Sequence, residues 1–94
     1  MPDQLIDNTE RGRYEYPVEG TLAFVDYRRV DGAIALTHAE VPHELEGRGI
    51  GSRMVRAVLD AIRADGGKVI PQCSFVVAFM RKHREYHDLL APSN

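Results

Sequence analysis

The spacing of apolar residues in this chain changes from a strand pattern to a helical pattern at a turn that holds three glycines within five residues. Before the turn, apolar side chains alternate with polar ones, as in β-strands. After it they recur every three or four residues, as on one face of an α-helix. The turn is EGRGIGS, with Gly47, Gly49 and Gly51. This order of patterns predicts a mixed α+β domain in which strands from the first half meet a helix from the second.

Two short turns divide the first half of the chain into three predicted strands. Asp31-Gly32 gives the strongest hairpin signal, because a type I′ turn needs positive φ at both of its central residues. Glu19-Gly20 forms the other turn, and residues 1–10 are expected to be a polar lead-in. The resulting antiparallel meander has its strands at residues 11–18, 21–30 and 33–41.

The second half predicts two helices around a short buried strand. The first helix spans residues 51–65 and ends at Gly66-Gly67, since glycine tolerates the left-handed position after a helix. KVIP, at residues 68–71, is the strand, and a right-handed crossover places it parallel to the third strand. Ser74 is expected to cap the second helix, FVVAFMRKH, and EYHDLL adds a helical turn. The predicted apolar face of the first helix comprises Ile50, Met54, Val55, Val58, Leu59 and Ile62.

Length and composition indicate one globular domain over residues 1–94, with its core in residues 11–90. The chain is 44% hydrophobic and 28% charged, which is too apolar for a disordered protein. A net charge of −2 gives no general reason to expect nucleic acid or a membrane surface as a partner. One cysteine excludes an intrachain disulfide, and no apolar run reaches the length of a membrane span, so we expect a cytoplasmic protein.

The glycine turn is itself a candidate anion site. A helix N-terminus presents backbone N–H groups without intrahelical partners at the positive end of the helix dipole, and phosphates bind there. Glycines at alternate positions remove Cβ atoms from the approach, and Arg48 adds a positive charge. Taken alone, the turn fits this function and a plain strand-to-helix loop equally well. It is not a Walker A loop, because no Lys-Ser/Thr follows its last glycine.

The residues around this turn resemble the GNAT superfamily of acyl-CoA-dependent N-acyltransferases. The family motif Arg/Gln-x-x-Gly-x-Gly/Ala corresponds to residues 46–51. Together with VIPQCSFVVAFMRKHREY, the stretch EVPHELEGRGIGSRMV is similar to very small, single-domain GNAT-like acetyltransferases, over residues 11–90. The resemblance implies a minimal GNAT-like fold and transfer of an acetyl group from acetyl-CoA to an amine, without a metal.

The resemblance also implies where acetyl-CoA binds. The third and fourth strands would splay apart, the pantetheine arm would lie between them against the backbone of Val41, and the pyrophosphate would rest on the glycine turn. Glu46 departs from the motif, and its negative charge near a pyrophosphate costs energy. The implied binding residues are Val41, Gly47, Arg48, Gly49, Ile50, Gly51 and Ser52.

Three residues are candidates for the transfer chemistry. His38 and Glu40 lie two apart on a strand and therefore on one face. By the resemblance Glu40 is a general base with His38 as its competitor, and an ordinary solvated pair explains them equally well. Cys73, at the end of the fourth strand, is a proton donor, a transient acyl acceptor or a pocket-lining residue, with direct transfer to the amine as the default. Met80 occupies the place of the tyrosine that many GNAT enzymes use as general acid, and it cannot donate a proton.

The leading hypothesis is therefore an acetyl-CoA-dependent N-acetyltransferase acting on a small amine, a peptide, or a protein lysine or N-terminus. The alternative is a CoA-binding module with little or no activity, which Glu46 and Met80 favour. The basic run at residues 81–84 either contacts the 3′-phosphate of CoA or is a solvated helix end, which cations favour. A nucleic-acid-binding domain is disfavoured by the negative net charge.

Overall fold

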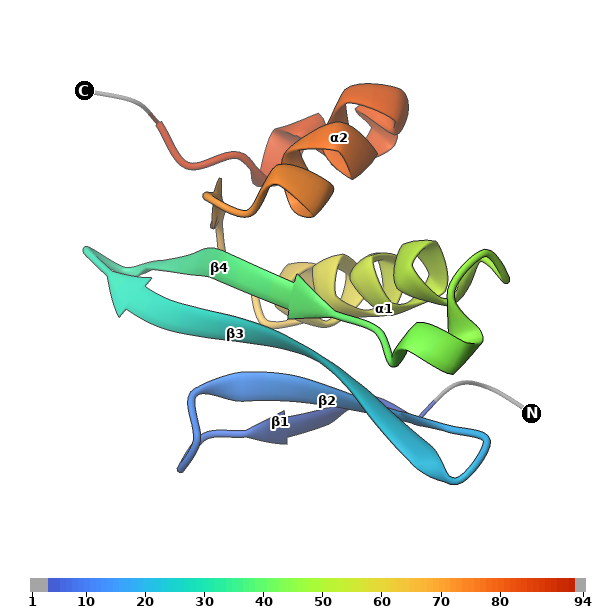
Figure 1. Ribbon diagram of the computed structural model, residues 1–94. Coiled ribbons are helices and arrows are strands. Elements are labelled where there is room, and N and C mark those ends of the chain that lie inside the picture. Colours follow the sequence, from blue (N-terminus) through green and yellow to red (C-terminus); the bar gives the residue numbers. More distant parts are fainter. Residues whose placement is uncertain (1–3, 93–94) are drawn as a thin grey trace.

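The computed structural model describes residues 4–92, which form one five-stranded sheet packed against helices (Figure 1). The strands follow each other across the sheet in chain order, the first four antiparallel and the last parallel to the fourth. The predicted α+β order, an antiparallel meander followed by a helix, a parallel strand and a helix, is confirmed. The strands are β1 Ile6–Asn8, β2 Arg13–Val18, β3 Thr21–Val30, β4 Ala33–Glu40 and β5 Val69–Pro71.

The first strand, β1, was not predicted. Residues expected to be a polar lead-in instead pair antiparallel with β2, Asp7 opposite Tyr14. A three-residue strand has too few positions to show an alternation, so its sequence carries no signal. The Tyr27 hydroxyl donates a hydrogen bond of 2.6 Å to the Asp7 carboxylate, which ties β1 to a strand two places away. Residues 1–3 of the expected lead-in lie outside the described residues.

Both α-helices and the C-terminal 3₁₀ turn match their predicted positions to within a residue or two, whereas the short 3₁₀ turn at residues 43–45 was not predicted. The α-helices are α1 Ile50–Ala64 and α2 Ser74–Lys82, and the 3₁₀ turns are η1 His43–Leu45 and η2 Arg84–Leu89. At the end of α1, Gly66 has φ +74° and donates to the Arg63 carbonyl, while Gly67 donates to the Ile62 carbonyl. These two bonds form a Schellman motif, which explains the predicted Gly-Gly stop. Within residues 4–92, no helix combines the length and hydropathy that a membrane crossing needs.

One helix cap was predicted wrongly. Ser74 is the first residue of α2 and not its cap, because Cys73 before it has extended backbone angles and takes the N-cap position. The Cys73 side chain forms no capping hydrogen bond in the described part of the chain. The β5–α2 connection therefore places a thiol at the helix start.

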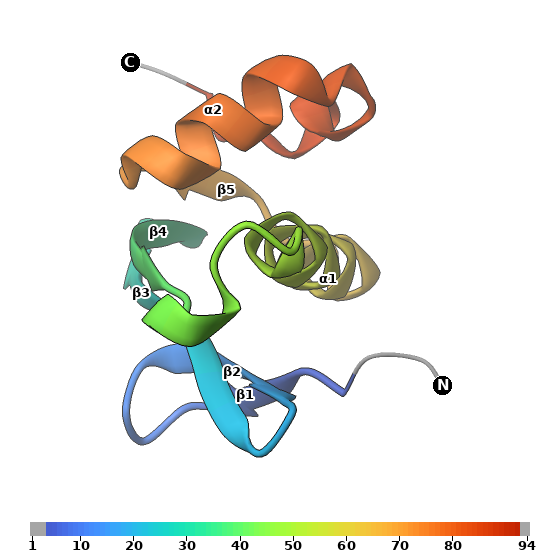
Figure 2. The same cartoon turned by 45° about the vertical axis from the view of Figure 1, so that its right-hand side comes forward.

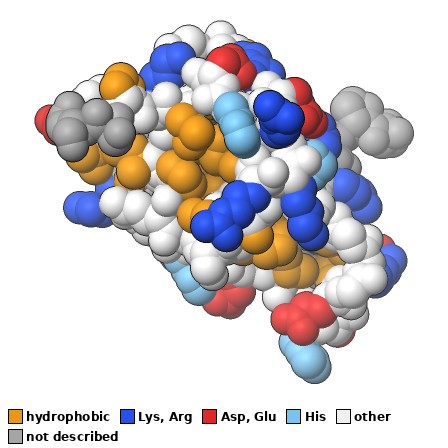
Figure 3. Space-filling view, turned by 90° about the horizontal axis from the view of Figure 1, so that it is seen from above, with side chains coloured by type: hydrophobic (Ala, Val, Ile, Leu, Met, Phe, Trp, Pro, Cys, Tyr) orange, Lys and Arg blue, Asp and Glu red, His pale blue; other side chains and the backbone are white. Residues whose placement is uncertain are grey.

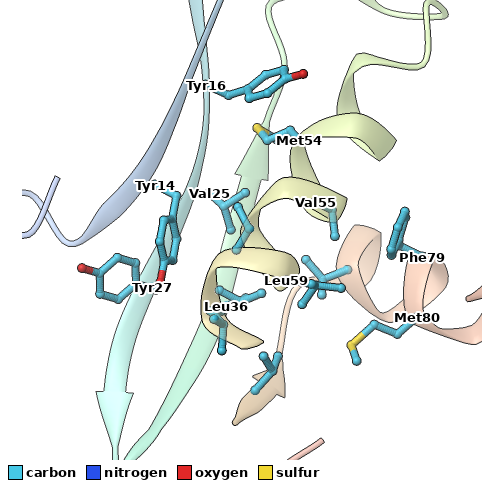
Figure 4. Packing of buried hydrophobic residues seen from close by; sticks show 14 of the residues in the cluster. Tyr14, Tyr16, Val25, Tyr27, Leu36, Met54, Val55, Leu59, Phe79 and Met80 are labelled. Atoms are coloured by element: carbon cyan, nitrogen blue, oxygen red, sulfur yellow. The ribbon is translucent and has the colours of Figure 1, made fainter. Parts of the chain in front are cut away.

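A single core joins the sheet to both α-helices. In Figure 2, α1 lies along one side of the curved sheet and α2 lies above it. Figure 4 shows Tyr16 and Val25 of the sheet directed towards Met54 and Val55 of α1, with Phe79 arriving from α2. The whole predicted apolar face of the helix is buried: Ile50, Met54, Val55, Val58, Leu59 and Ile62.

A β-bulge interrupts β4. Leu36 pairs with Tyr27, but the next pair along the strands is His38 with Asp26, so Thr37 is an extra residue. The Thr37 hydroxyl donates to the Asp26 carbonyl at 3.3 Å. A bulge reverses which face the following side chains take and bends its strand. Leu36 is fully buried, whereas His38 two residues later is exposed.

The tyrosines on β2 and β3 should make stability sensitive to high pH. Burial, followed by the negative charge of Asp7, raises the pKa of Tyr14 to about 12. Burial and then the hydrogen bond to Asp7 raise the pKa of Tyr27 to about 12. From pH 10 upwards the unfolded chain loses phenol protons that the folded chain retains, so the free energy of unfolding is full below pH 10 and falls as pH rises towards 12. Urea denaturation on either side of pH 10 measures this decline.

The control is the double variant Tyr14→Phe/Tyr27→Phe, which removes both phenols and should flatten the decline. An equally steep decline in that variant would assign the base sensitivity to other groups.

Candidate functional site

A cleft of about 390 Å³ opens where β4 ends and α1 begins. The cleft is lined by the end of β4 and the residue after it, by the first turn of α1, and by Phe75 from α2. Most of its surface is backbone and apolar side chain. The lining residues are Ala39, Val41, Leu45, Glu46, Gly47, Gly49, Ile50, Gly51, Ser52, Met54 and Phe75.

The first turn of α1 presents free backbone donors to this cleft. Gly49 is the N-cap residue, and the first bond to its carbonyl comes from the Arg53 N–H. The N–H groups from Gly49 to Ser52 precede that bond and have no intrahelical acceptor. Within residues 4–92 no side chain caps them, and the first turn of α1 carries no acidic residue. The helix dipole and the uncapped donors together favour an anion here.

The three glycines of the turn have different local roles. Gly47 and Gly49 have φ of +80° and +74°, which L-residues rarely adopt, and a Cβ on either would meet no atom within 4 Å. Gly51 has ordinary helical geometry, but a Cβ there would lie 2.8 Å from the Phe75 ring. Conformation therefore requires the first two glycines, and the third gives Phe75 space against the start of α1.

Two charged side chains beside the turn are already paired. The Arg48 guanidinium forms a two-pronged ion pair with the Glu19 carboxylate in the β2–β3 turn, and Arg48 does not line the cleft. Glu46 does line the cleft, and its carboxylate lies 3.3 Å from His43 Nδ1. Both side chains are more than half exposed, so solvent weakens each pair. An anion in the cleft would compete with Glu19 for Arg48.

β4 and β5 separate next to the cleft. They pair only from Ile34 to Leu36, although β4 continues to Glu40. The N–H groups of Gln72 and Cys73 both donate to the Leu36 carbonyl at 3.0 Å, and the chain then turns into α2. In the described part of the chain, no strand pairs with residues 37–40 of β4 along the edge that faces β5. Cys73, partly buried, stands at the point of separation.

His38 and Glu40 form a pair on one face of the sheet. His38 Nε2 lies 3.1 Å from Glu40 Oε1, and both side chains are more than half exposed. Because neighbouring side chains alternate, they project from the opposite face to Ala39, which lines the cleft. The expected shared face is confirmed. Neither residue lines the cleft, and neither does Cys73.

Met80, in the place of the usual tyrosine acid, and Tyr86, the next tyrosine along the chain, both lie in the core. Met80 is buried, as its apolar side chain requires. Tyr86 is also buried and its hydroxyl donates to Asp60 at 2.7 Å, which holds η2 against α1. Neither residue lines the cleft. Among residues 4–92 there is also no group of three or more His, Cys, Asp or Glu side chains placed to hold a metal ion.

Comparison with known proteins identifies the family. Residues 13–89, most of the chain, match the GCN5-related N-acetyl-transferase family, and the protein belongs to it. The solution NMR structure of a GCN5-like protein from Staphylococcus aureus is similar, with a TM-score of 0.72 and 26% sequence identity over 97% of this chain and 90% of that one. No curated protein matches the chain significantly. The resemblance drawn from the glycine turn and the C-terminal segment is thus confirmed, and so is the fold.

Substitution should separate the roles of the glycines. Gly49→Ala should lower the free energy of unfolding by roughly 1–2 kcal/mol, because alanine must adopt a left-handed conformation. Gly51→Ala should instead depend on Phe75. In a Phe75→Ala background it should stabilise by about 0.5–1 kcal/mol through helix propensity, and in the wild-type background displacement of the ring should offset that gain. Urea denaturation of the wild type, Gly49→Ala, Gly51→Ala, Phe75→Ala and Gly51→Ala/Phe75→Ala measures these effects. Equal effects of Gly51→Ala in both backgrounds would contradict the packing role.

Proposed function

We propose that this protein is an acetyl-CoA-dependent N-acetyltransferase that transfers the acetyl group directly to an amine. The observation that carries the proposal is the cleft, which joins uncapped N–H groups at the start of α1 to an unpaired strand edge on β4. The first can hold a pyrophosphate and the second can bond to amides of an extended pantetheine arm. Membership in the GCN5-related family supports this assignment.

The proposed binding residues, apart from Arg48, all line the cleft. Gly49, Ile50, Gly51 and Ser52 would donate their N–H groups to the pyrophosphate, and the Gly47 conformation delivers the chain to that turn. The pantetheine amides would bond to the backbone at Val41, where the strand has ended and Pro42 cannot donate. Arg48 would contribute charge only after leaving Glu19.

The transfer chemistry falls to the residues around the separation of β4 and β5. Acetyl-CoA supplies an activated thioester, which an uncharged amine can attack. Glu40, held by His38 on the face opposite the cleft wall, would take the proton from the amine, directly or through water. Cys73, at the start of α2, would lie near the leaving thiolate. The amine would approach through the gap between the strands, from the side of His38 and Glu40.

The second candidate function is a CoA-binding module with little or no transferase activity. Two observations favour it. Glu46 lines the cleft with a carboxylate where the family motif has Arg or Gln, and the residue in the place of the usual tyrosine acid is the buried Met80. Both candidates require the same binding site and differ only in turnover. For either, we place the protein in the cytoplasm, in keeping with its single cysteine.

Binding of acetyl-CoA is the first test. Calorimetry should give a dissociation constant within the range of about 1 µM to 1 mM that is typical of enzyme substrates. Ala39→Trp should weaken binding by about tenfold or more, since the indole would fill the cleft beside β4. Ala57→Trp is the matched control, because Ala57 is also partly buried but lines a separate depression with Arg56 and Asp60, about two turns along α1 from Ile50 and outside the cleft. Failure of the folded wild-type protein to bind acetyl-CoA would contradict both candidate functions.

Turnover then separates the candidates. The assay measures the rate of CoA release by chromatography, with a panel of primary amines and lysine peptides as acceptors. This rate should fall roughly 100-fold or more in Glu40→Gln, while the affinity for acetyl-CoA is unchanged. His38→Gln should lower the rate of CoA release less than Glu40→Gln does, because His38 only positions Glu40. Cys73→Ser should stay within a few-fold of wild type if transfer is direct.

Two other results would revise the mechanism. A Cys73→Ser variant without activity, with an acetylated Cys73 in the wild-type protein by mass spectrometry, would establish transfer through the thiol. Binding of acetyl-CoA without CoA release for any amine would favour the binding module.

A further inference from the structure

A second depression, here called the α2 hollow, adjoins the cleft on the surface of α2. It has a volume of about 90 Å³. Ser52 and Phe75 line both it and the cleft, so the two are continuous at the start of α1. The α2 hollow is lined by Ser52, Phe75, Ala78, Phe79, Lys82 and His83.

Most of the residues that line the α2 hollow lie in a row along α2, so the hollow forms a path along the helix. Phe75, Ala78, Phe79 and Lys82 are three, four and seven residues apart and so share one face of α2. Two helical turns separate Phe75 from Lys82, about 10 Å along the axis. Figure 3 shows the molecule from above, on the side of α2, where apolar side chains are bordered by Lys, Arg and His side chains. The path runs from the free N–H groups of α1 to an ammonium group.

Lys82 is the cation in the α2 hollow whose charge is uncompensated. It is exposed, and within residues 4–92 it forms no ion pair or hydrogen bond through its side chain. His83, by contrast, stacks on Phe79 at 4.1 Å between ring centroids, and its Nδ1 lies 3.3 Å from Arg56 and 3.5 Å from the Glu85 carboxylate. The α2 hollow therefore offers one unpaired positive charge beside two aromatic rings.

We propose that the α2 hollow binds the 3′-phosphate of the CoA nucleotide, with Lys82 as its main ligand. The inference rests on the proposed function, because it requires the pyrophosphate at the first turn of α1. A pyrophosphate there places the ribose beside Ser52 and Phe75, where the α2 hollow begins, and the 3′-phosphate is attached to that ribose. Lysine binds phosphate as a point charge and has the reach to adjust to it.

The test compares CoA with 3′-dephospho-CoA, which differ only in this phosphate. Calorimetry at low salt should show that the wild-type protein binds CoA about tenfold more tightly, the effect of one exposed charge-assisted contact. Lys82→Ala should lose this preference while still binding 3′-dephospho-CoA as the wild type does. Arg81→Ala is the matched control and should keep the preference, because Arg81 is an exposed cation on the same helix that does not line the α2 hollow. Physiological salt should reduce the preference for CoA over 3′-dephospho-CoA, because ions screen the attraction between Lys82 and the phosphate.

The outcomes separate this inference from the function on which it rests. Equal affinity of the wild-type protein for CoA and 3′-dephospho-CoA, or a preference that survives in Lys82→Ala, would overturn the role of the α2 hollow and leave the cleft proposal standing. Failure of the wild-type protein to bind either ligand would overturn both.

Discussion

The separation of β4 from β5 is the constraint on which the geometry of the site depends. β5 is only three residues long. After it ends at Pro71, the N–H groups of Gln72 and Cys73 both donate to one carbonyl, that of Leu36. At the same point along β4, the extra residue Thr37 bends the strand and reverses its faces. Without the bulge, His38 would continue the buried face of Leu36 and Ala39 would point away from α1. One inserted residue therefore places an apolar wall on the cleft side and a polar pair on the other.

Helix α1 connects this strand edge to the rest of the molecule. Its buried stripe fixes the helix along the sheet, so the direction of its uncapped N-terminus follows from packing of the core. Towards its other end, α1 is bonded to the C-terminal segment: the Tyr86 hydroxyl donates to Asp60, and the Arg63 guanidinium donates to the Glu85 carbonyl. The anion-binding turn is therefore the exposed end of a rigid element. A site of this kind combines backbone donors with a position that the core determines.

The sequence predicted the elements well because each has a local cause. The positive φ values of +49° at Asp31 and +82° at Gly32 are those that a type I′ hairpin turn requires at its two central residues. The end of α1 follows from a Gly-Gly pair that completes a Schellman motif. Less was predictable where the cause lies elsewhere in the chain. β1 depends on pairing with β2, and the partner of Arg48 is Glu19, 29 residues away. No local pattern marks Phe75 as a site residue, since only the packing of α2 on α1 brings its ring to Gly51.

The sequence by itself determined the order of strands and helices, the buried stripe of α1 and the glycine turn that marks the family, because hydrophobic period and backbone preference act over a few residues. The tertiary structure decided which of those residues share a site. It assembled the cleft from β4, the α1 turn and Phe75, and it paired Arg48 with Glu19. Among residues 4–92, it left the Lys82 side chain without a partner in the α2 hollow. These arrangements depend on the bulge at Thr37 and on the packing of two helices, which are contacts between residues far apart in the chain.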